Sequence, residues 1–156
     1  MKKFLISLPI DAVVPGGVYG TLPSHCTVLQ PFETKRTAED ITYAVKQVCR
    51  NTRPLELNAA GRELFGPDCD VPVTMLERTP ALVNLHLEVT TAIEHEGGKI
   101  LDPEWAKDGY RPYVSDFHGR RYSGQGYLAD KLAVIEFFPN RVKRVVAIVP
   151  LDEWLL

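Results

Sequence analysis

The chain has 156 residues, about the length of one globular domain, and its 45% hydrophobic and 24% charged residues exclude a disordered or fibrous protein. The 18 Lys and Arg against 20 Asp and Glu give a formal net charge of −2, which argues against a protein that binds duplex DNA by general positive charge. A small or single-stranded phosphate ligand held by a few local cations stays compatible with this balance.

The first half of the chain predicts two strands, a helix and two further strands. Strands are expected over residues 3–9 and 24–30, with a Pro/Gly-rich loop between them. Thr37 then provides a hydroxyl cap for a helix, because apolar residues follow at i, i+3, i+4 and i+7. Alternating apolar residues predict a strand over 54–60, and after a turn another strand is expected over 71–77.

The second half repeats this pattern. Thr79-Pro80 predicts the start of a second helix, which Gly97-Gly98 ends. Strands are expected over 110–117, 132–138 and 142–149. Two strand-rich halves with one long helix each predict an α+β fold in which the helices cover the outer faces of antiparallel sheets. No linker-like segment interrupts the chain, so we expect one compact unit.

Cysteine usage and the N-terminus indicate the compartment. Cys26, Cys49 and Cys69 are an odd number without CxxC spacing, which favours neither a disulfide framework nor a zinc site. The apolar run after the first lysines resembles a signal peptide, but Pro9 and Asp11 end it too early. No apolar stretch is long enough to span a bilayer. We therefore expect a cytoplasmic protein without a membrane partner.

The segment Ser24 to Leu29 is the first candidate site. Strand alternation places His25, Thr27 and Leu29 on one face, with Cys26 and Val28 on the other. An imidazole and a hydroxyl in that arrangement can serve one phosphate, the first by moving a proton and the second by donating to an oxygen. The alternative is a strand-end histidine that is simply hydrogen-bonded or solvated.

The second candidate site is the strand around Tyr113. Alternation places Arg111, Tyr113 and Ser115 on one face, which gives a cation, a phenol and a hydroxyl in one row. Considered by itself, this row is equally typical of a surface ladder packed around an aromatic side chain.

Together the two sites resemble the two-histidine (2H) phosphoesterases, the superfamily of bacterial 2′-5′ RNA ligase-like proteins and cyclic phosphodiesterases. Each half of such a protein has a strand with His-x-Thr/Ser followed by an apolar residue. The resemblance implies two pseudo-symmetric lobes over residues 1–156, each an antiparallel sheet with an outer helix, and a central cleft lined by both motifs. It extends over nearly the whole chain through the segments His25–Phe32, Leu64–Gly66, Val73–Leu76, Tyr110–Ser115 and Ala147–Leu151.

One position departs from the family pattern. The second motif of the family has Arg-Pro-His-x-Ser/Thr, and Tyr113 stands where that histidine belongs. Two imidazoles can remove one proton and supply another near neutral pH, whereas a phenol with a pKa near 10 donates but is a poor base. Loss of one acid–base partner lowers a rate by about 10²- to 10⁴-fold. His118 would replace the missing imidazole only if the strand bulges or ends near Asp116.

The resemblance implies a metal-independent phosphodiesterase-like protein without a cofactor. Its substrates would be a 2′,3′-cyclic phosphate, RNA ends with 2′-5′ or 3′-5′ linkages, or small cyclic oligonucleotides. His25 would be the general acid or base, Thr27 and Ser115 would hold the phosphate, Tyr113 would take the place of the second histidine, and Arg111 would add positive charge at the substrate. Some phage members of the family destroy cyclic nucleotide signals of bacterial immunity, and the size of this chain is compatible with such a role.

Two alternatives remain. Because Tyr113 replaces a histidine, the chain would also suit a catalytically impaired protein that sequesters a nucleotide or RNA, or that serves as an adaptor. A domain with a degenerate cleft that uses its surface for protein contacts is the third possibility. Neither the substrate nor the oligomeric state follows from the sequence.

Overall fold

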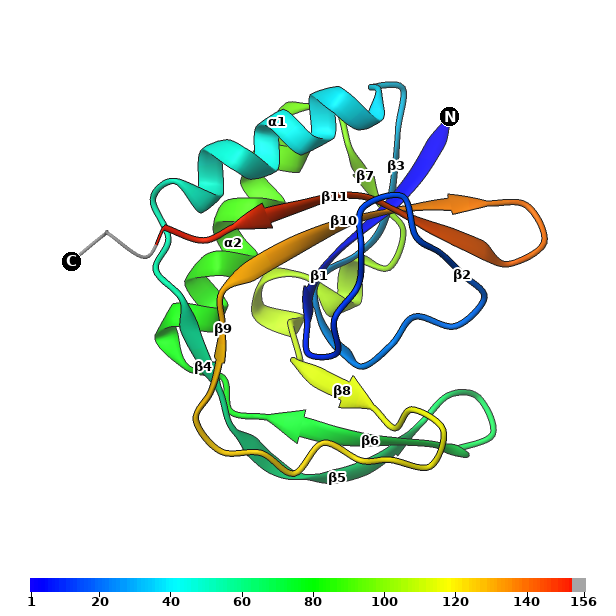
Figure 1. The fold of residues 1–156 in the computed structure, drawn as a ribbon, viewed down its shortest axis with the longest axis vertical. Helices are drawn as coiled ribbons and strands as arrows, with labels where there is room; N and C mark the ends of the chain where they lie inside the picture. Colours follow the sequence, from blue (N-terminus) through cyan, green and yellow to red (C-terminus); the bar gives the residue numbers. More distant parts are fainter. Residues whose placement is uncertain (153–156) are drawn as a thin grey trace.

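Two helices pack on one face of a bent antiparallel sheet in the computed structural model, which describes residues 1–152 (Figure 1). The helices are α1 (Ala38–Cys49) and α2 (Pro80–His95), with two short 3₁₀ helices, η1 (Pro103–Trp105) and η2 (Lys107–Gly109). The strands are β1 (Lys2–Pro9), β2 (Val18–Tyr19), β3 (His25–Thr34), β4 (Leu55–Leu57), β5 (Ala59–Phe65), β6 (Val71–Leu76), β7 (Lys99–Ile100), β8 (Tyr113–Ser115), β9 (Tyr127–Ala129), β10 (Lys131–Phe138) and β11 (Val142–Pro150). The predicted α+β fold is confirmed.

The large sheet has two halves. Strands β2, β11, β10, β1 and β3 form the first half-sheet, and β8, β6 and β5 form the second, in that spatial order. A single register pair, Cys26 with Val114, joins β3 to β8 between them. Strand β7 pairs with β3, and β4 pairs with β9 in a separate two-stranded sheet.

Two predicted strands are broken or shortened in the structure. The strand expected over 54–60 is broken into β4, which pairs with β9, and β5, which pairs with β6. The strand expected over 110–117 is limited to Tyr113–Ser115, because two 3₁₀ turns precede it and a tight Phe117–Arg120 turn follows. Short strands such as these depend on tertiary pairing rather than on local pattern.

The predicted helix starts are confirmed. Thr37 caps α1 in a capping box: its Oγ1 accepts from the Asp40 amide at 3.1 Å, while Asp40 Oδ2 accepts from the Thr37 amide at 3.2 Å. The hydroxyl of Thr79 accepts from the amide of Leu82 at 3.3 Å, and Pro80 is the first residue of α2. Both helices therefore begin where the sequence predicts.

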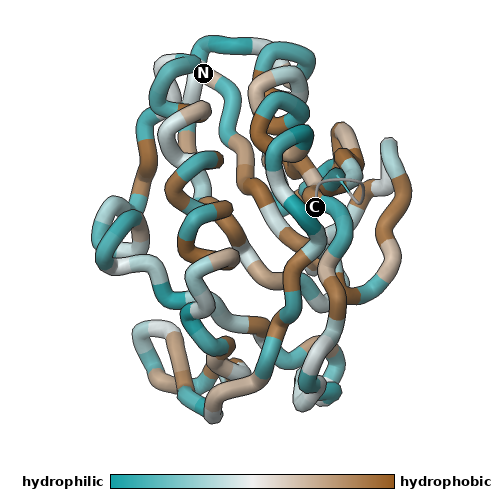
Figure 2. Tube along the Cα trace, turned by 90° about the vertical axis from the view of Figure 1, so that its left-hand side faces the viewer, coloured by the Kyte–Doolittle hydropathy of each residue, from teal (hydrophilic) through white to brown (hydrophobic). Residues whose placement is uncertain are grey.

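The main core lies between the helices and the first half-sheet. In Figure 2 hydrophobic residues recur along both helices and the long strands, alternating with hydrophilic ones. The largest fully buried side chains of this core are Tyr110, Phe4, Phe32, Ile6, Leu8, Leu29, Ile41, Leu57, Leu82, Leu85, Ile93 and Leu132. A second, smaller cluster around Leu5 and Ile135 covers the opposite face of the first half-sheet.

Strand β3 does not alternate strictly. Thr27 pairs with Ser7 and Leu29 pairs with Ile6, so one extra residue lies on β3 between these two pairs. The bulge turns Leu29 into the main core together with Cys26 and Val28. The sequence-based placement of Leu29 on the face of His25 and Thr27 was therefore wrong.

His86 of α2 is fully buried and ties three segments together. Its Nδ1–H donates to the carbonyl of Val28 at 2.6 Å, and its Nε2 accepts from the amide of Lys107 at 2.8 Å. Its ring stacks on that of Tyr110, with centroids 4.0 Å apart and planes 2° from parallel. Burial lowers the pKa of His86, which keeps the imidazole in the neutral form that this pair of bonds requires.

The helices of the described part of the chain include none that is both long and apolar enough to cross a bilayer.

Replacing His86 with alanine should lower the free energy of unfolding by on the order of 3–5 kcal/mol. The change leaves a carbonyl and an amide without partners in the interior and opens a cavity under Tyr110. Urea unfolding followed by circular dichroism measures the loss. His95→Ala, at an exposed histidine of the same helix, is the matched control and should stay within about 0.5 kcal/mol of wild type. Equal losses in the two variants would contradict the role of His86.

Candidate functional site

A cavity of about 310 Å³ brings the two motif strands together. His25 and Thr27 of β3 and Tyr113 and Ser115 of β8 all line it, although the two strands are far apart in the sequence. Residues of β1, β10, β11 and the loop before β3 complete the wall. We call this space the central cavity.

His25 stands at the first position of β3 and is half-buried. Its Nδ1–H donates to the carbonyl of Pro23 at 2.8 Å, which leaves Nε2 as the nitrogen without a proton in the neutral ring. Burial lowers the pKa of His25, and the positive charge of Lys143 lowers it further. At neutral pH the imidazole is therefore neutral and can act as a base through Nε2.

Thr27 follows His25 on the same face of β3. Its carbonyl accepts from the hydroxyl of Tyr110 at 2.9 Å on the core side, so the backbone of the strand is fixed from behind. Its own hydroxyl makes no hydrogen bond within residues 1–152 and lies at the wall of the central cavity. A hydroxyl in that position can donate to a ligand oxygen.

Tyr113 belongs to β8 and is held by aromatic contacts. Its ring lies edge-on to Phe65, with centroids 4.9 Å apart, and to Trp105, at 5.9 Å. Burial raises the pKa of Tyr113, although a side-chain hydrogen bond with Gln30 lowers it. The phenol therefore stays protonated at neutral pH and can donate a proton but cannot serve as a base.

Arg111 does not line the central cavity. Its Nη2 donates to Glu63 Oε2 at 2.6 Å, and its guanidinium lies 5.3 Å from the ring centroid of Phe65 and 5.9 Å from that of Trp105. The row that alternation predicts on β8 is thus divided: Tyr113 and Ser115 line the cavity, and Arg111 packs outside it.

Lys143 is the cavity cation that sequence reasoning missed. It lies on β11 and its Nζ donates to the carbonyl of Gly20 at 2.9 Å. Asp116 also lines the cavity, but Arg62 binds both of its oxygens, at 2.6 and 2.8 Å, and lowers its pKa. The only signal for Lys143 in the sequence is the basic cluster Arg141 to Arg144, at the start of the last predicted strand.

His118 does not replace the missing imidazole at the cavity wall. Strand β8 ends at Ser115, but His118 lies at the exposed turn between Phe117 and Arg120, with φ 49°. Its ring packs against Phe117 with centroids 4.2 Å apart, and it is not among the residues that line the central cavity. Arg120 from the same turn pairs with Asp11.

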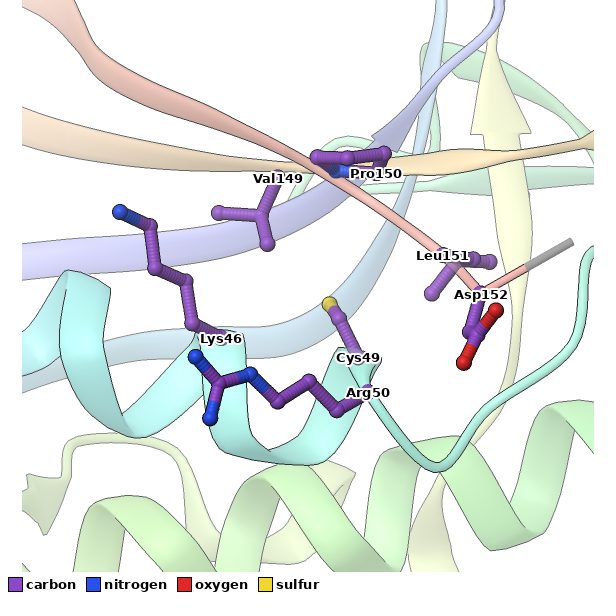
Figure 3. Close-up of a pocket in the computed structure, with 7 residues that line it drawn as sticks. All are labelled: Lys46, Cys49, Arg50, Val149, Pro150, Leu151 and Asp152. Atoms are coloured by element: carbon purple, nitrogen blue, oxygen red, sulfur yellow. The ribbon is translucent and has the colours of Figure 1, made fainter. Parts of the chain in front are cut away.

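A larger hollow of about 580 Å³ lies between the end of α1 and β11 (Figure 3). Lys46 and Arg50 supply its cations, and Cys49 is its one nucleophile. Burial raises the pKa of Cys49 to about 12, so its thiol is not ionised at neutral pH. This hollow lacks the imidazole and the phenol of the central cavity.

No group of three or more His, Cys, Asp or Glu side chains positioned for a metal ion occurs within residues 1–152.

Solved structures share this fold. A Thermus thermophilus protein matches with a TM-score of 0.61 and 15% identity, over 97% of this chain and 98% of its own. Escherichia coli LigT in complex with 3′-AMP matches with a TM-score of 0.61 and 11% identity, also over 97% and 98%. A structure described as a phosphoesterase matches with a TM-score of 0.52 and 14% identity, over 99% and 98%. No family model and no curated protein matches the sequence.

An NMR titration of the histidine rings tests the electrostatics of the cavity. We expect the pKa of His25 to lie below 6.5, and Lys143→Gln should raise it because removal of a positive charge stabilises the imidazolium. The pKa of His86 is the internal reference, since Lys143 is not among the charges that perturb it. An unchanged or lower pKa of His25 in the variant would show that Lys143 does not act on this ring.

Proposed function

We propose that the chain, as one two-lobed unit over residues 1–156, is a metal-independent phosphodiesterase-like protein of the 2H type that acts on 2′,3′-cyclic phosphates or on 2′-5′ or 3′-5′ linked RNA and small oligonucleotides. The observation that supports this most directly is the central cavity. A neutral imidazole with a free Nε2, two hydroxyls and a phenol line one space of nucleotide size there.

The chemistry needs two proton movements and stabilisation of charge on the phosphate. His25 Nε2 would take the proton of the attacking hydroxyl or water as the new P–O bond forms. Thr27 and Ser115 would donate to the non-bridging oxygens, where negative charge develops. The hydroxyl of Tyr113 would give its proton to the leaving oxygen as the old P–O bond breaks. The imidazolium of His25 would then lose its proton to solvent, and the phenolate would regain one from solvent.

The comparisons support a nucleotide ligand. LigT, which has this fold, was solved with 3′-AMP and with NADP⁺. Both ligands are nucleotides with phosphate groups, and the wall of the central cavity includes two hydroxyls and a lysine that could contact a phosphate. If this chain had the role of the phage members that destroy cyclic nucleotide signals, it would use the same cavity.

A binding protein without turnover is the second candidate, and one observation favours it. Burial raises the pKa of Tyr113, which packs in one cluster with Phe65 and Trp105, so its proton is harder to release than that of a solvated phenol. A site with one working proton-transfer group would bind phosphates well and cleave them slowly.

His25→Ala separates the two candidates. For an enzyme, the variant should lose about 10²- to 10⁴-fold in turnover of 2′,3′-cyclic AMP while its affinity for 3′-AMP changes much less. Thr27→Ala should instead weaken binding, because it removes a donor to the phosphate. Product analysis by chromatography and calorimetric titration measure the two effects. Tight binding with no turnover by wild type or by His25→Ala would establish the binding protein.

Tyr113→His tests the departure from the family pattern. An imidazole at this position supplies the missing acid–base partner opposite His25, so we expect the rate on a 2′,3′-cyclic or 2′-5′ substrate to rise by on the order of 10²-fold. Steady-state kinetics, with the melting temperature as a check on folding, measures the change. A fall from measurable wild-type activity would mean that the phenol itself takes part. His118→Ala is the matched control and should leave the rate unchanged, because His118 lies outside the cavity wall.

A further inference from the structure

Three side chains on adjacent strands form a row that begins in the wall of the central cavity. Lys3 on β1 is the cross-strand partner of Phe137 on β10, which in turn is the partner of Lys143 on β11. The Nζ of Lys3 lies 4.7 Å from the centroid of the Phe137 ring, and the Nζ of Lys143 lies 5.7 Å from it. We call these residues the Lys–Phe–Lys row.

The row is continuous with the proposed phosphate site. Phe137 and Lys143 line the same cavity as His25 and Thr27. Lys3, Leu5 and Ser7 occupy successive positions on one face of β1, and Ser7 is the cross-strand partner of Thr27. Two members of the row thus belong to the cavity wall, and Lys3 extends the row beyond that wall, along β1 from the position that pairs with Thr27.

The two lysines differ from three arginines near the cavity that pair with acidic side chains. Arg62, Arg111 and Arg120 pair with Asp116, Glu63 and Asp11, respectively. Within residues 1–152, Lys3 and Lys143 form no ion pair, not even Lys3 with its cross-strand neighbour Glu33. Lys143 uses one N–H on the carbonyl of Gly20, and an ammonium group has three.

We propose that the Lys–Phe–Lys row is a subsite for a second phosphate and its attached base, so that the protein selects oligonucleotides with two or more phosphates over mononucleotides. This inference rests on the proposed function at His25 and extends it. The ammonium groups of Lys3 and Lys143 would contact the second phosphate, and a base would stack on the half-buried ring of Phe137. Stacking accepts any base, so the subsite would read chain length rather than sequence.

The experiment compares one and two phosphates on the same protein. The ligands are deoxyadenosine 3′-phosphate, the deoxyadenosine dinucleotide with a 3′-phosphate, and a cyclic diadenylate. The first two lack the 2′-hydroxyl and so resist internal cleavage. Calorimetric titration at several salt concentrations gives Kd and its salt dependence. We expect the dinucleotide to bind more tightly and with a steeper salt dependence than the mononucleotide.

Lys3→Gln is the decisive variant, because Lys3 lies outside the cavity wall. It should weaken binding of the dinucleotide by up to about fivefold and lower the slope of log Kd against log salt concentration by about 0.7. Binding of the mononucleotide should be unaffected. Lys2→Gln is the matched control: it removes the same charge from the neighbouring position of β1, where Lys2 pairs with Glu136 on the other face. Melting temperatures of both variants check the fold.

Each remaining outcome decides the matter. A dinucleotide that binds no tighter than the mononucleotide, while Thr27→Ala still weakens both, would overturn the subsite and leave the proposed function intact. If Lys2→Gln and Lys3→Gln weaken dinucleotide binding equally, the effect would be one of general charge, and the proposed subsite would be overturned as well. Binding of neither nucleotide would overturn both proposals. If Lys3→Gln weakens binding of the cyclic diadenylate alone, the result would support the subsite and identify cyclic oligonucleotides as its ligands.

Discussion

The neutral imidazole of His86 is the constraint on which the site depends. It is buried where α2, β3 and η2 meet, and both of its nitrogens bond to backbone groups of other segments. Tyr110, stacked on its ring, bonds in turn to the carbonyl of Thr27. The face of β3 that carries His25 and Thr27 is thus fixed by polar contacts on the opposite face, which are expensive to break in the interior.

The architecture followed from the sequence because its signals are local. The hydroxyl caps at Thr37 and Thr79 and the helical periodicity behind them depend only on neighbouring residues, and both helices begin there. The bulge in β3 depends instead on the register against β1, so alternation misplaced Leu29. The division of residues 54–60 between β4 and β5 likewise depends on pairing with distant strands.

The candidate site was predictable to a similar extent. His25, Thr27, Tyr113 and Ser115 were named from two short motifs, and all four line one cavity. The placement of cations was not predictable, because a guanidinium or ammonium group is directed by whichever carboxylate or ring the fold brings near it. The side chain of Arg111 is therefore drawn to Glu63 and away from the cavity.

The single register pair between β3 and β8 has a mechanical consequence. Within the described sheet one pair, Cys26 with Val114, joins the two half-sheets, so side-chain contacts carry more of the connection here than ladder hydrogen bonds do. Across this seam the hydroxyl of Tyr110 adds a hydrogen bond to the carbonyl of Thr27 on β3, from the core side of the sheet. A ligand that touches both half-sheets would add contacts across this seam, where only one register pair of the described sheet joins them.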